Sequence, residues 1–307
     1  MNKVKNRIAY FAKLESVIVV STFFSLWLAV IFEDVLEYIV AYLFILSFGI
    51  LHGANDLNLI LKNTKNTGTS KNYLKVLLYY VLFVLASIGL FYLIPSLALF
   101  VFVVFSGYHF GEQHLLLKTT TRSWYVSLLY LVYGLFILFL LFRTNYVMTN
   151  DIIQKITQFK IPLRAFDLGL WISGLLTACL GTLAVLQKKI KINVIKELFF
   201  LAVFFVVFKT ASLLWGFAIY FILWHSIPSL IDQMFYLHGE ANRKTFYIFF
   251  KSSFPYWLIS IVGLFMIIFL FRDNLETSLA FFFSFLAAIT FPHVLVINRL
   301  NKPKTEF

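Results

Sequence analysis

Long runs of apolar residues, separated by short polar connections, occupy most of the chain. A transmembrane helix needs about 20 mainly apolar residues, and ten runs approach or exceed that length. We therefore predict an all-α fold, a polytopic transmembrane helical bundle that forms one integral membrane domain over residues 1–307. The predicted spans are 14–32, 35–61, 73–94, 95–117, 123–142, 165–187, 193–209, 210–237, 254–271 and 275–300.

The pattern is less regular at three places. The seventh span is short, and its junction with the eighth falls near Lys209. The segment 148–160 is apolar only in part, so we interpret it as an interfacial or loop helix. Pro228 lies inside the eighth span, where a proline is tolerated in a membrane but releases nearby backbone groups from the helix.

The distribution of basic residues tests the span count. With the N-terminus in the cytoplasm, 20 of the 26 Lys and Arg residues fall in cytoplasmic segments and 6 fall outside. Cytoplasmic loops of membrane proteins carry such an excess of Lys and Arg. The alternation therefore supports ten spans with both termini in the cytoplasm, and it makes the even-numbered helices parallel to one another.

Composition agrees with a membrane protein. The chain is 61% hydrophobic and 13% charged, whereas soluble domains carry about 25% charged residues. The net charge of +12 is spread over short loops and forms no basic stripe, so we expect no nucleic-acid partner. A single cysteine, Cys179, excludes an internal disulfide framework.

Ionisable residues deep inside predicted spans are confined to four helices. Such residues are costly in a membrane and generally face the interior of the bundle. The second, fourth, eighth and tenth spans carry them, whereas the other spans have ionisable residues only near their ends. These residues are His52 and Asp56; His109, Glu112 and His114; His225 and Asp232; and His293.

Helical spacing places the carboxylates beside the histidines. Asp56 follows His52 by four residues and Glu112 follows His109 by three, so each pair shares a helix face. Asp232 follows His225 by seven residues, which is two helical turns. Carboxylates next to metal-binding histidines fix the ring orientation, and we expect Asp56, Glu112 and Asp232 to orient ligands in this way.

The predicted topology brings four histidines to one depth. His52, His109, His225 and His293 lie 17, 14, 15 and 18 residues into four parallel helices. At 1.5 Å per residue their depths differ by about 6 Å. We predict a shared metal or proton site at these four histidines, although an intramembrane histidine can also serve as a hydrogen-bonded contact between helices.

Histidines without thiolates suit iron but also zinc, copper and nickel. Neutral imidazoles would hold Fe(II) and leave positions open for O₂. Membrane desaturases and hydroxylases also use histidines, but they need clustered HxxxH and HxxHH boxes. The chain has six histidines and no such box, which argues against that class.

Four sequence elements, HGANDL, YHFGEQH, WHSIPS and PHVLVI, occur in an order that resembles the Brp/Blh family of membrane β-carotene 15,15′-dioxygenases. The resemblance extends over roughly residues 40 to 300. It implies that His52, His109 and His225 bind iron. The chain departs from the family pattern at Ser229, where a second histidine is usual, and at His114, where an Asp is usual. For the fourth ligand we choose His293 from its depth, with His114 as the reserve.

The resemblance implies an Fe(2+) enzyme that cleaves the central double bond of β-carotene with O₂ into two retinal molecules. No side chain beyond the metal ligands is then expected to act as a catalytic acid or base. The partners would be a carotenoid, O₂, the lipid bilayer of a bacterial or archaeal cell membrane and a retinal-binding rhodopsin that accepts the product. Two other functions stay open: a transporter that uses the His/carboxylate cluster, and a carotenoid-binding or assembly protein without activity.

Overall fold

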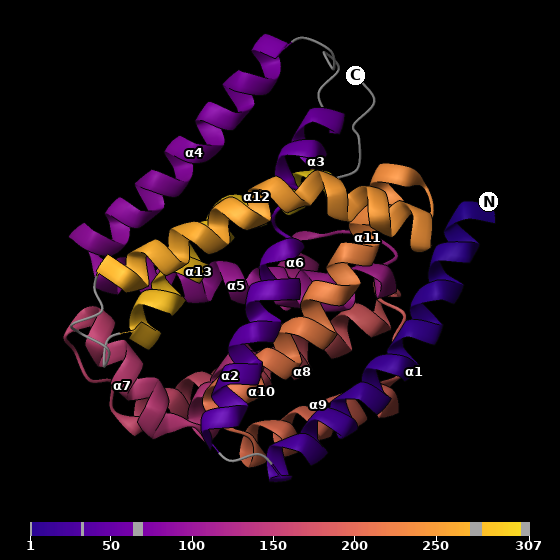
Figure 1. Cartoon of the computed structure of the whole chain (residues 1–307). Helices are drawn as coiled ribbons and strands as arrows, with labels where there is room; N and C mark the ends of the chain where they lie inside the picture. The colour runs from indigo at the N-terminus through magenta and orange to yellow at the C-terminus, as the bar shows by residue number, and fades with distance from the viewer. Residues whose placement is uncertain (1, 32–33, 64–69, 271–277, 302–307) are drawn as a thin grey trace. The chain divides into compact units, whose positions relative to one another are not determined.

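The structure of the chain is a computed structural model that describes residues 2–31, 34–63, 70–270 and 278–301. Helices make up most of these segments, and no β-strand occurs within them, so the predicted all-α fold is confirmed. Figure 1 shows the helices in chain order. They are α1 Asn2–Ile31, α2 Asp34–Phe44, α3 Asp56–Asn63, α4 Ser70–Leu93, α5 Pro95–Leu115, α6 Trp124–Thr144, α7 Tyr146–Thr157, α8 Leu163–Leu186, α9 Val194–Thr210, α10 Leu213–Ile219, α11 Ile227–His238, α12 Arg243–Leu270 and α13 Ser278–Asn301.

Three short helices of other types interrupt or extend this series. Two are π-helices, η1 Ile45–Gly49 and η3 Tyr220–Ser226, and one is the 3₁₀-helix η2 Leu116–Lys118. A π-helix has i→i+5 hydrogen bonds and is rare, and it occurs frequently at functional sites. Both π-helices lie close in sequence to a histidine of the predicted metal site.

Seven helices in the described part of the chain are long and apolar enough to cross a membrane. The second predicted span, α5 and α9 are not among them; α9 has 17 residues. The count of ten spans and the cytoplasmic termini therefore stay predictions. Parts of the predicted spans at residues 32, 271 and 275–277 lie outside the described residues. The same holds for four of the counted basic residues, Lys65, Arg272, Lys302 and Lys304. The seven helices are Arg7–Ile31, Tyr73–Leu93, Trp124–Thr144, Leu163–Leu186, Leu213–His238, Arg243–Met266 and Phe281–Asn298.

The prediction of one continuous helix over 35–61 is wrong. Helical structure ends at Leu51, a turn covers residues 52–55, and α3 begins at Asp56. In the turn, the N–H groups of Gly53 and Ala54 both bond to the carbonyl of Ile50. His52 and Asp56 therefore do not share a face of one helix.

The eighth predicted span is one helical run whose centre is a π-helix. The N–H of Ile227 bonds to the carbonyl of Ile222, five residues back. Pro228 follows directly and has no N–H to donate to residue 224, so regular α-helical bonding cannot continue here. Near Lys209 the helix is interrupted: α9 ends at Thr210, α10 begins at Leu213, and the Ser212 hydroxyl accepts a hydrogen bond from Trp215 N–H. The division into a seventh and an eighth span stays a prediction. The predicted short helix at 148–160 is present as α7.

The chain forms two compact units, each made of several sequence segments. Unit 1 consists of residues 1–49, 103–151 and 159–230, and unit 2 of residues 50–102, 152–158 and 231–307. In unit 1, α1 packs on α9 and on η3, α6 packs on α8, and α10 contacts α2 and α9 (Figure 1). All seven residues of α10 are buried, so this short helix is part of the core of unit 1.

Glycines let α5 and α6 approach each other closely within unit 1. A Cβ built on Gly134 would overlap the carbonyl oxygen of Gly107, and a Cβ built on Gly111 would overlap that of Tyr130. Small residues spaced in this way bring membrane helices into backbone contact. This packing sets the position of α5, the helix that carries His109.

We expect Gly134→Ala to destabilise the protein. The added methyl group meets backbone atoms, which cannot rotate away as a side chain can, and such overpacking costs about 1–3 kcal/mol or more. Gly181→Ala is the matched control, because nothing lies within 4 Å of a Cβ at Gly181. Thermal unfolding in detergent should show a lower midpoint for Gly134→Ala alone; equal midpoints for both variants would contradict the close α5–α6 contact.

Unit 2 contains α3, α4, α12 and α13. Helix α13 packs on α3, α4 and α12, and α3 packs on α4. Val296 and Ile297 of α13 and Leu59 of α3 form a buried apolar cluster. The hydroxyl groups of Tyr73 on α4 and Tyr256 on α12 share a hydrogen bond. Unit 2 therefore places α3 and α4 against the helix that carries His293.

Several helices expose large apolar side chains along their length. On α4, Leu74 and Leu78 are exposed, and on α8 the same holds for Trp171 and Leu175. Contiguous apolar surface of this kind is rare on soluble proteins and is expected where helices face lipid. These surfaces agree with a multi-pass membrane protein.

Candidate functional site

In unit 1, the structure brings His109 and His225 together. His109 lies on α5 and His225 on η3, and their ring centroids are 4.6 Å apart at an angle of 75°. Both side chains are about 1% exposed, so the two imidazoles lie in the interior. We call these residues the unit 1 histidine pair.

Aromatic rings surround His225. The ring centroid of Phe110 lies 4.7 Å from that of His225. The ring of Phe221 stacks on the His225 ring, with a centroid separation of 5.7 Å and an interplanar angle of 15°. Gly49 of η1 allows this arrangement, because a Cβ at that position would lie 2.7 Å from the Phe221 ring. Two aromatic rings therefore pack directly on the His225 imidazole, beside that of His109.

Glu112, one turn after His109 on α5, forms an ion pair with Arg122. Arg122 Nη2 donates to Glu112 Oε1 at 2.8 Å, and the Glu112 side chain is 1% exposed. A buried carboxylate needs such a partner, because an uncompensated buried charge is strongly destabilising. The role of Glu112 in orienting His109 stays a prediction.

In unit 2, the structure brings His52 and His293 together. Their ring centroids are 4.7 Å apart and the rings are nearly perpendicular, at 89°. His52 lies in the turn after Leu51, and His293 lies on α13 directly after Pro292. Both side chains are buried. We call these residues the unit 2 histidine pair.

Asp56 holds one ring of this pair. Its Oδ1 atom lies 2.8 Å from Nδ1 of His293. An ionised carboxylate only accepts hydrogen bonds, so opposite it Nδ1 of His293 is the donor, and in the neutral imidazole Nε2 then carries the lone pair. Asp56 is the first residue of α3, where the positive end of the helix dipole stabilises its charge. The expected contact of Asp56 with a candidate ligand is present, and its partner is His293.

Two residues that sequence analysis did not single out support the unit 2 pair. Tyr80 on α4 donates its hydroxyl hydrogen to Oδ2 of Asp56 at 3.0 Å. Gln233 on α11 donates from Nε2 to the backbone carbonyl of His52 at 2.9 Å. A tyrosine within an apolar span and a glutamine near a helix end are common in membrane helices, so no signal in the sequence marked them.

The turn that contains His52 is built from small and polar residues. A Cβ at Gly53 would lie 3.7 Å from Nδ1 of His293, so the turn passes close to that ring. Asn55 is completely buried, and its side-chain oxygen accepts hydrogen bonds from Asn58 and Ser252. These bonds satisfy the buried side-chain oxygen of Asn55 within the turn.

Two further residues of the predicted site lie on α11. Ser229, which occupies the place of the usual family histidine, is buried in unit 1 four residues after His225. Asp232 lies in unit 2 and is half-buried. The expected orienting role of Asp232 stays a prediction.

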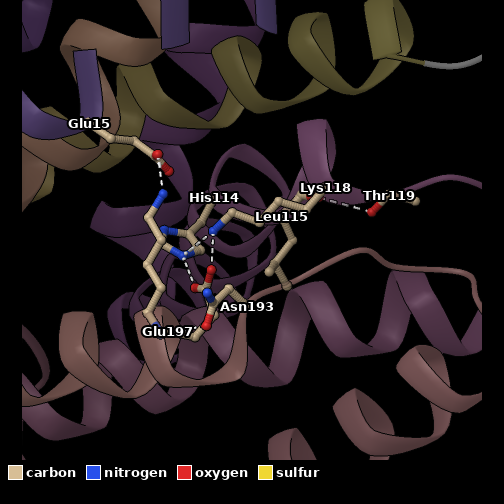
Figure 2. Close-up of polar contacts among 8 residues, drawn as sticks. Glu15, His114, Leu115, Lys118, Thr119, Asn193 and Glu197 are labelled. Carbon is tan, nitrogen blue, oxygen red and sulfur yellow. Dashed lines mark hydrogen bonds and ion pairs between the residues drawn. The ribbon is translucent and has the colours of Figure 1, made fainter. Parts of the chain in front are cut away.

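His114, the reserve ligand, belongs to a cluster of charged residues in unit 1 (Figure 2). Its Nε2 atom lies 2.8 Å from Glu197 Oε2 and 3.0 Å from the ammonium nitrogen of Lys118. Lys118 also donates to Glu197, and Lys196 pairs with Glu15 beside them. Burial lowers the pKa of Lys118, and Glu197 opposes that shift. An ammonium group 3.0 Å away would repel a metal cation, so this neighbourhood suits His114 poorly as a ligand.

A cavity of about 270 Å³ lies next to this cluster, within unit 1. Its wall includes charged residues from α1, η2 and α9, and apolar residues such as Phe11, Ile18 and Trp224. His109 and His225 are not among the residues that line it. The cavity is therefore a feature separate from the unit 1 histidine pair.

Comparison with protein families identifies the class of the chain. The family described as "Beta-carotene 15,15'-dioxygenase" matches residues 43–301. The chain belongs to this family. The match contains both histidine pairs, Asp56 and Tyr80, whereas α1 lies outside it. Comparison with curated proteins and with solved structures gave no match.

Membership of the beta-carotene dioxygenase family implies a β-carotene substrate, and it raises the question of whether these residues can hold iron. Two imidazoles on one ion, with metal–nitrogen distances of about 2.1 Å and an angle near 90°, hold their ring centroids roughly 4.5 Å apart. The observed separations of 4.6 and 4.7 Å fit this value, and they also fit edge-to-face ring contact. Within the described part of either unit, no three His, Cys, Asp or Glu side chains form a candidate metal group.

Proposed function

We propose that the protein is an iron-dependent enzyme that cleaves the central 15,15′ double bond of β-carotene with O₂ to give two retinal molecules. Membership of the beta-carotene dioxygenase family supports the substrate. The observation that carries the site assignment is the pairing of four buried histidines as His109 with His225 and His52 with His293.

The bound iron would supply the redox chemistry with O₂, which no protein side chain can perform. The donor set suits this ion, because neutral imidazoles bind Fe(II) without the thiolates that favour other metals. In this proposal His52, His109, His225 and His293 hold the iron, with His293 as the fourth ligand. Asp56 fixes the His293 tautomer in which Nε2 carries the lone pair.

The protein's remaining task is to orient the polyene and exclude water. Phe110 and Phe221 form an apolar face beside His225, and such a face suits a hydrocarbon chain better than a polar substrate. The exposed apolar surfaces of α4 and α8 support a location in the bilayer, where β-carotene dissolves. We expect a bacterial or archaeal cell membrane, with retinal passing to a retinal-binding rhodopsin.

Expression in bacteria that accumulate β-carotene tests the proposal. Cells with the wild-type protein should lose carotenoid colour and form retinal, measured by chromatography of cell extracts. Cells with His52→Ala should keep their β-carotene although the variant protein reaches the membrane in equal amount. A ratio of two retinal molecules formed for each β-carotene lost would identify central cleavage.

Two results of the same experiment would decide against catalysis. If wild-type cells keep their β-carotene while the purified protein carries the pigment, the protein binds carotenoid without cleaving it, and Ser229 in place of a histidine is the residue to examine. If the protein neither binds nor cleaves carotenoid, ion flux through reconstituted vesicles would test the transporter function.

A further inference from the structure

We propose that Tyr80 is a positioning residue of the metal site, which locks the Asp56 carboxylate so that His293 presents Nε2 in a fixed direction. Nothing in the sequence pattern marks this residue, and its hydroxyl bonds to the carboxylate of Asp56. The inference rests on the proposed function, because it concerns a ligand of the proposed iron.

The geometry is a three-member chain that runs through unit 2. The Tyr80 hydroxyl donates to Oδ2 of Asp56 at 3.0 Å, and Oδ1 of the same carboxylate lies 2.8 Å from His293 Nδ1. Asp56 and His293 are buried, at 1% and 4% exposure. Each oxygen of the carboxylate thus has its own donor, so rotation of the carboxylate would break both bonds at once.

The three residues come from three helices that pack on one another. Asp56 begins α3, Tyr80 lies on α4 and His293 lies on α13, and each of these helices contacts the other two. Without Tyr80, the charge of Asp56 would still be stabilised by the first turn of α3. The specific contribution of Tyr80 is therefore the direction of the carboxylate rather than the stability of its charge.

The expected consequence is a change in metal binding with little change in the fold. Partners that orient metal-binding histidines affect metal affinity by 10- to 100-fold. Because Tyr80 acts one step further away, we expect Tyr80→Phe to weaken metal binding by about tenfold. The substitution removes one oxygen atom and keeps the ring, so the packing of α4 is preserved.

The experiment compares Tyr80→Phe with Tyr79→Phe. Tyr79 is the adjacent residue on α4 and is 61% exposed, which makes it a matched control for loss of one tyrosine hydroxyl. Each metal-free protein is purified in detergent and titrated with Co(II), whose visible spectrum reports the ligand field. We expect about tenfold weaker binding and an altered Co(II) spectrum for Tyr80→Phe, with wild-type behaviour for Tyr79→Phe. The thermal midpoints of the metal-free proteins should agree.

The experiment distinguishes failure of the positioning role of Tyr80 from failure of the proposed function. A wild-type Co(II) affinity and spectrum for Tyr80→Phe would overturn the positioning role while leaving the proposed function intact. Equal weakening in Tyr79→Phe would also overturn it, because the effect would then belong to α4 in general. If the wild-type protein binds neither Co(II) nor Fe(II), the proposed function itself fails, and this inference fails with it.

Discussion

Replacement of His225 by Gln is expected to reduce the iron content of the purified protein to less than about one hundredth of wild type, and to abolish retinal formation. His225 is 1% exposed, and the centroid of its ring lies 4.6 Å from that of His109. Loss of one ligand leaves the ion fewer strong donors and lets water complete the coordination. Iron per folded protein is measured by elemental analysis, and retinal by chromatography.

His238→Gln is the matched control, since His238 is exposed at the end of α11 and belongs to neither pair. It should keep wild-type iron and activity. Iron stoichiometry adds a second test, because the sequence predicts one shared ion for all four histidines. One iron per wild-type chain, lost on replacement of a histidine from either pair, would support that prediction. Full iron content in His225→Gln would contradict the assignment of the unit 1 pair.

The second large effect is expected for Asp56→Asn, which should lower metal affinity by about 10- to 100-fold. Asparagine has the shape of aspartate but is neutral, and its amide nitrogen can donate to His293 Nδ1. That hydrogen bond would favour the tautomer in which Nε2 carries the hydrogen, and such a nitrogen cannot bind a metal. Metal affinity is measured by titration of the metal-free protein, and retinal formation is measured in parallel.

Asp167→Asn provides the comparison for a carboxylate outside the candidate site. Asp167 pairs with Arg143 near the surface of unit 1, where both side chains are more than one third exposed. Exposed pairs of this kind contribute little, so this variant should behave as wild type. Wild-type metal affinity in Asp56→Asn would show that the bond to His293 has no part in metal binding.

The runs of apolar residues predicted where the helices lie, but they did not predict where the helices are interrupted. Runs of apolar residues locate helices in a membrane protein because every backbone group must be bonded within the segment. The turn at residues 52–55 escaped prediction, since its polar residues His52, Asn55 and Asp56 also suit a buried helix face. One contact to this turn is the hydrogen bond that the Ser252 hydroxyl donates to the Asn55 side-chain oxygen, and Ser252 lies 197 residues further along the chain.

The candidate ligands were predictable from chemistry, whereas their partners were not. Histidines deep inside apolar spans are rare enough to attract attention, and the structure forms one pair of them within each unit. The pairing of His52 with His293 depends on which helices are neighbours, and spacing along one helix contains no such information. For the same reason Asp56 was expected to serve His52, and its contact with His293 and Tyr80 was missed.

For the charged residues too, the sequence identified the candidates but not their partners. Glu112 was noticed because of its spacing from His109, but its partner Arg122 was counted only as part of a basic loop. His114 looked like a possible ligand from its position, and its contacts with Lys118 and Glu197 give it a different environment. The sequence shows the type of each residue, whereas its neighbours depend on how the helices pack.

The two π-helices make the directions of nearby side chains sensitive to insertion or deletion of one residue. Helices η1 and η3 contact each other within unit 1, through Gly49 and Phe221. A π-helix corresponds to one extra residue in an α-helix, and one residue turns every side chain beyond it by about 100°. Deletion of a single residue from 220–226 would therefore rotate Ser229 and the rest of α11 relative to α10. Insertion or deletion of one codon in this segment would therefore change the direction of a buried side chain without replacing that residue.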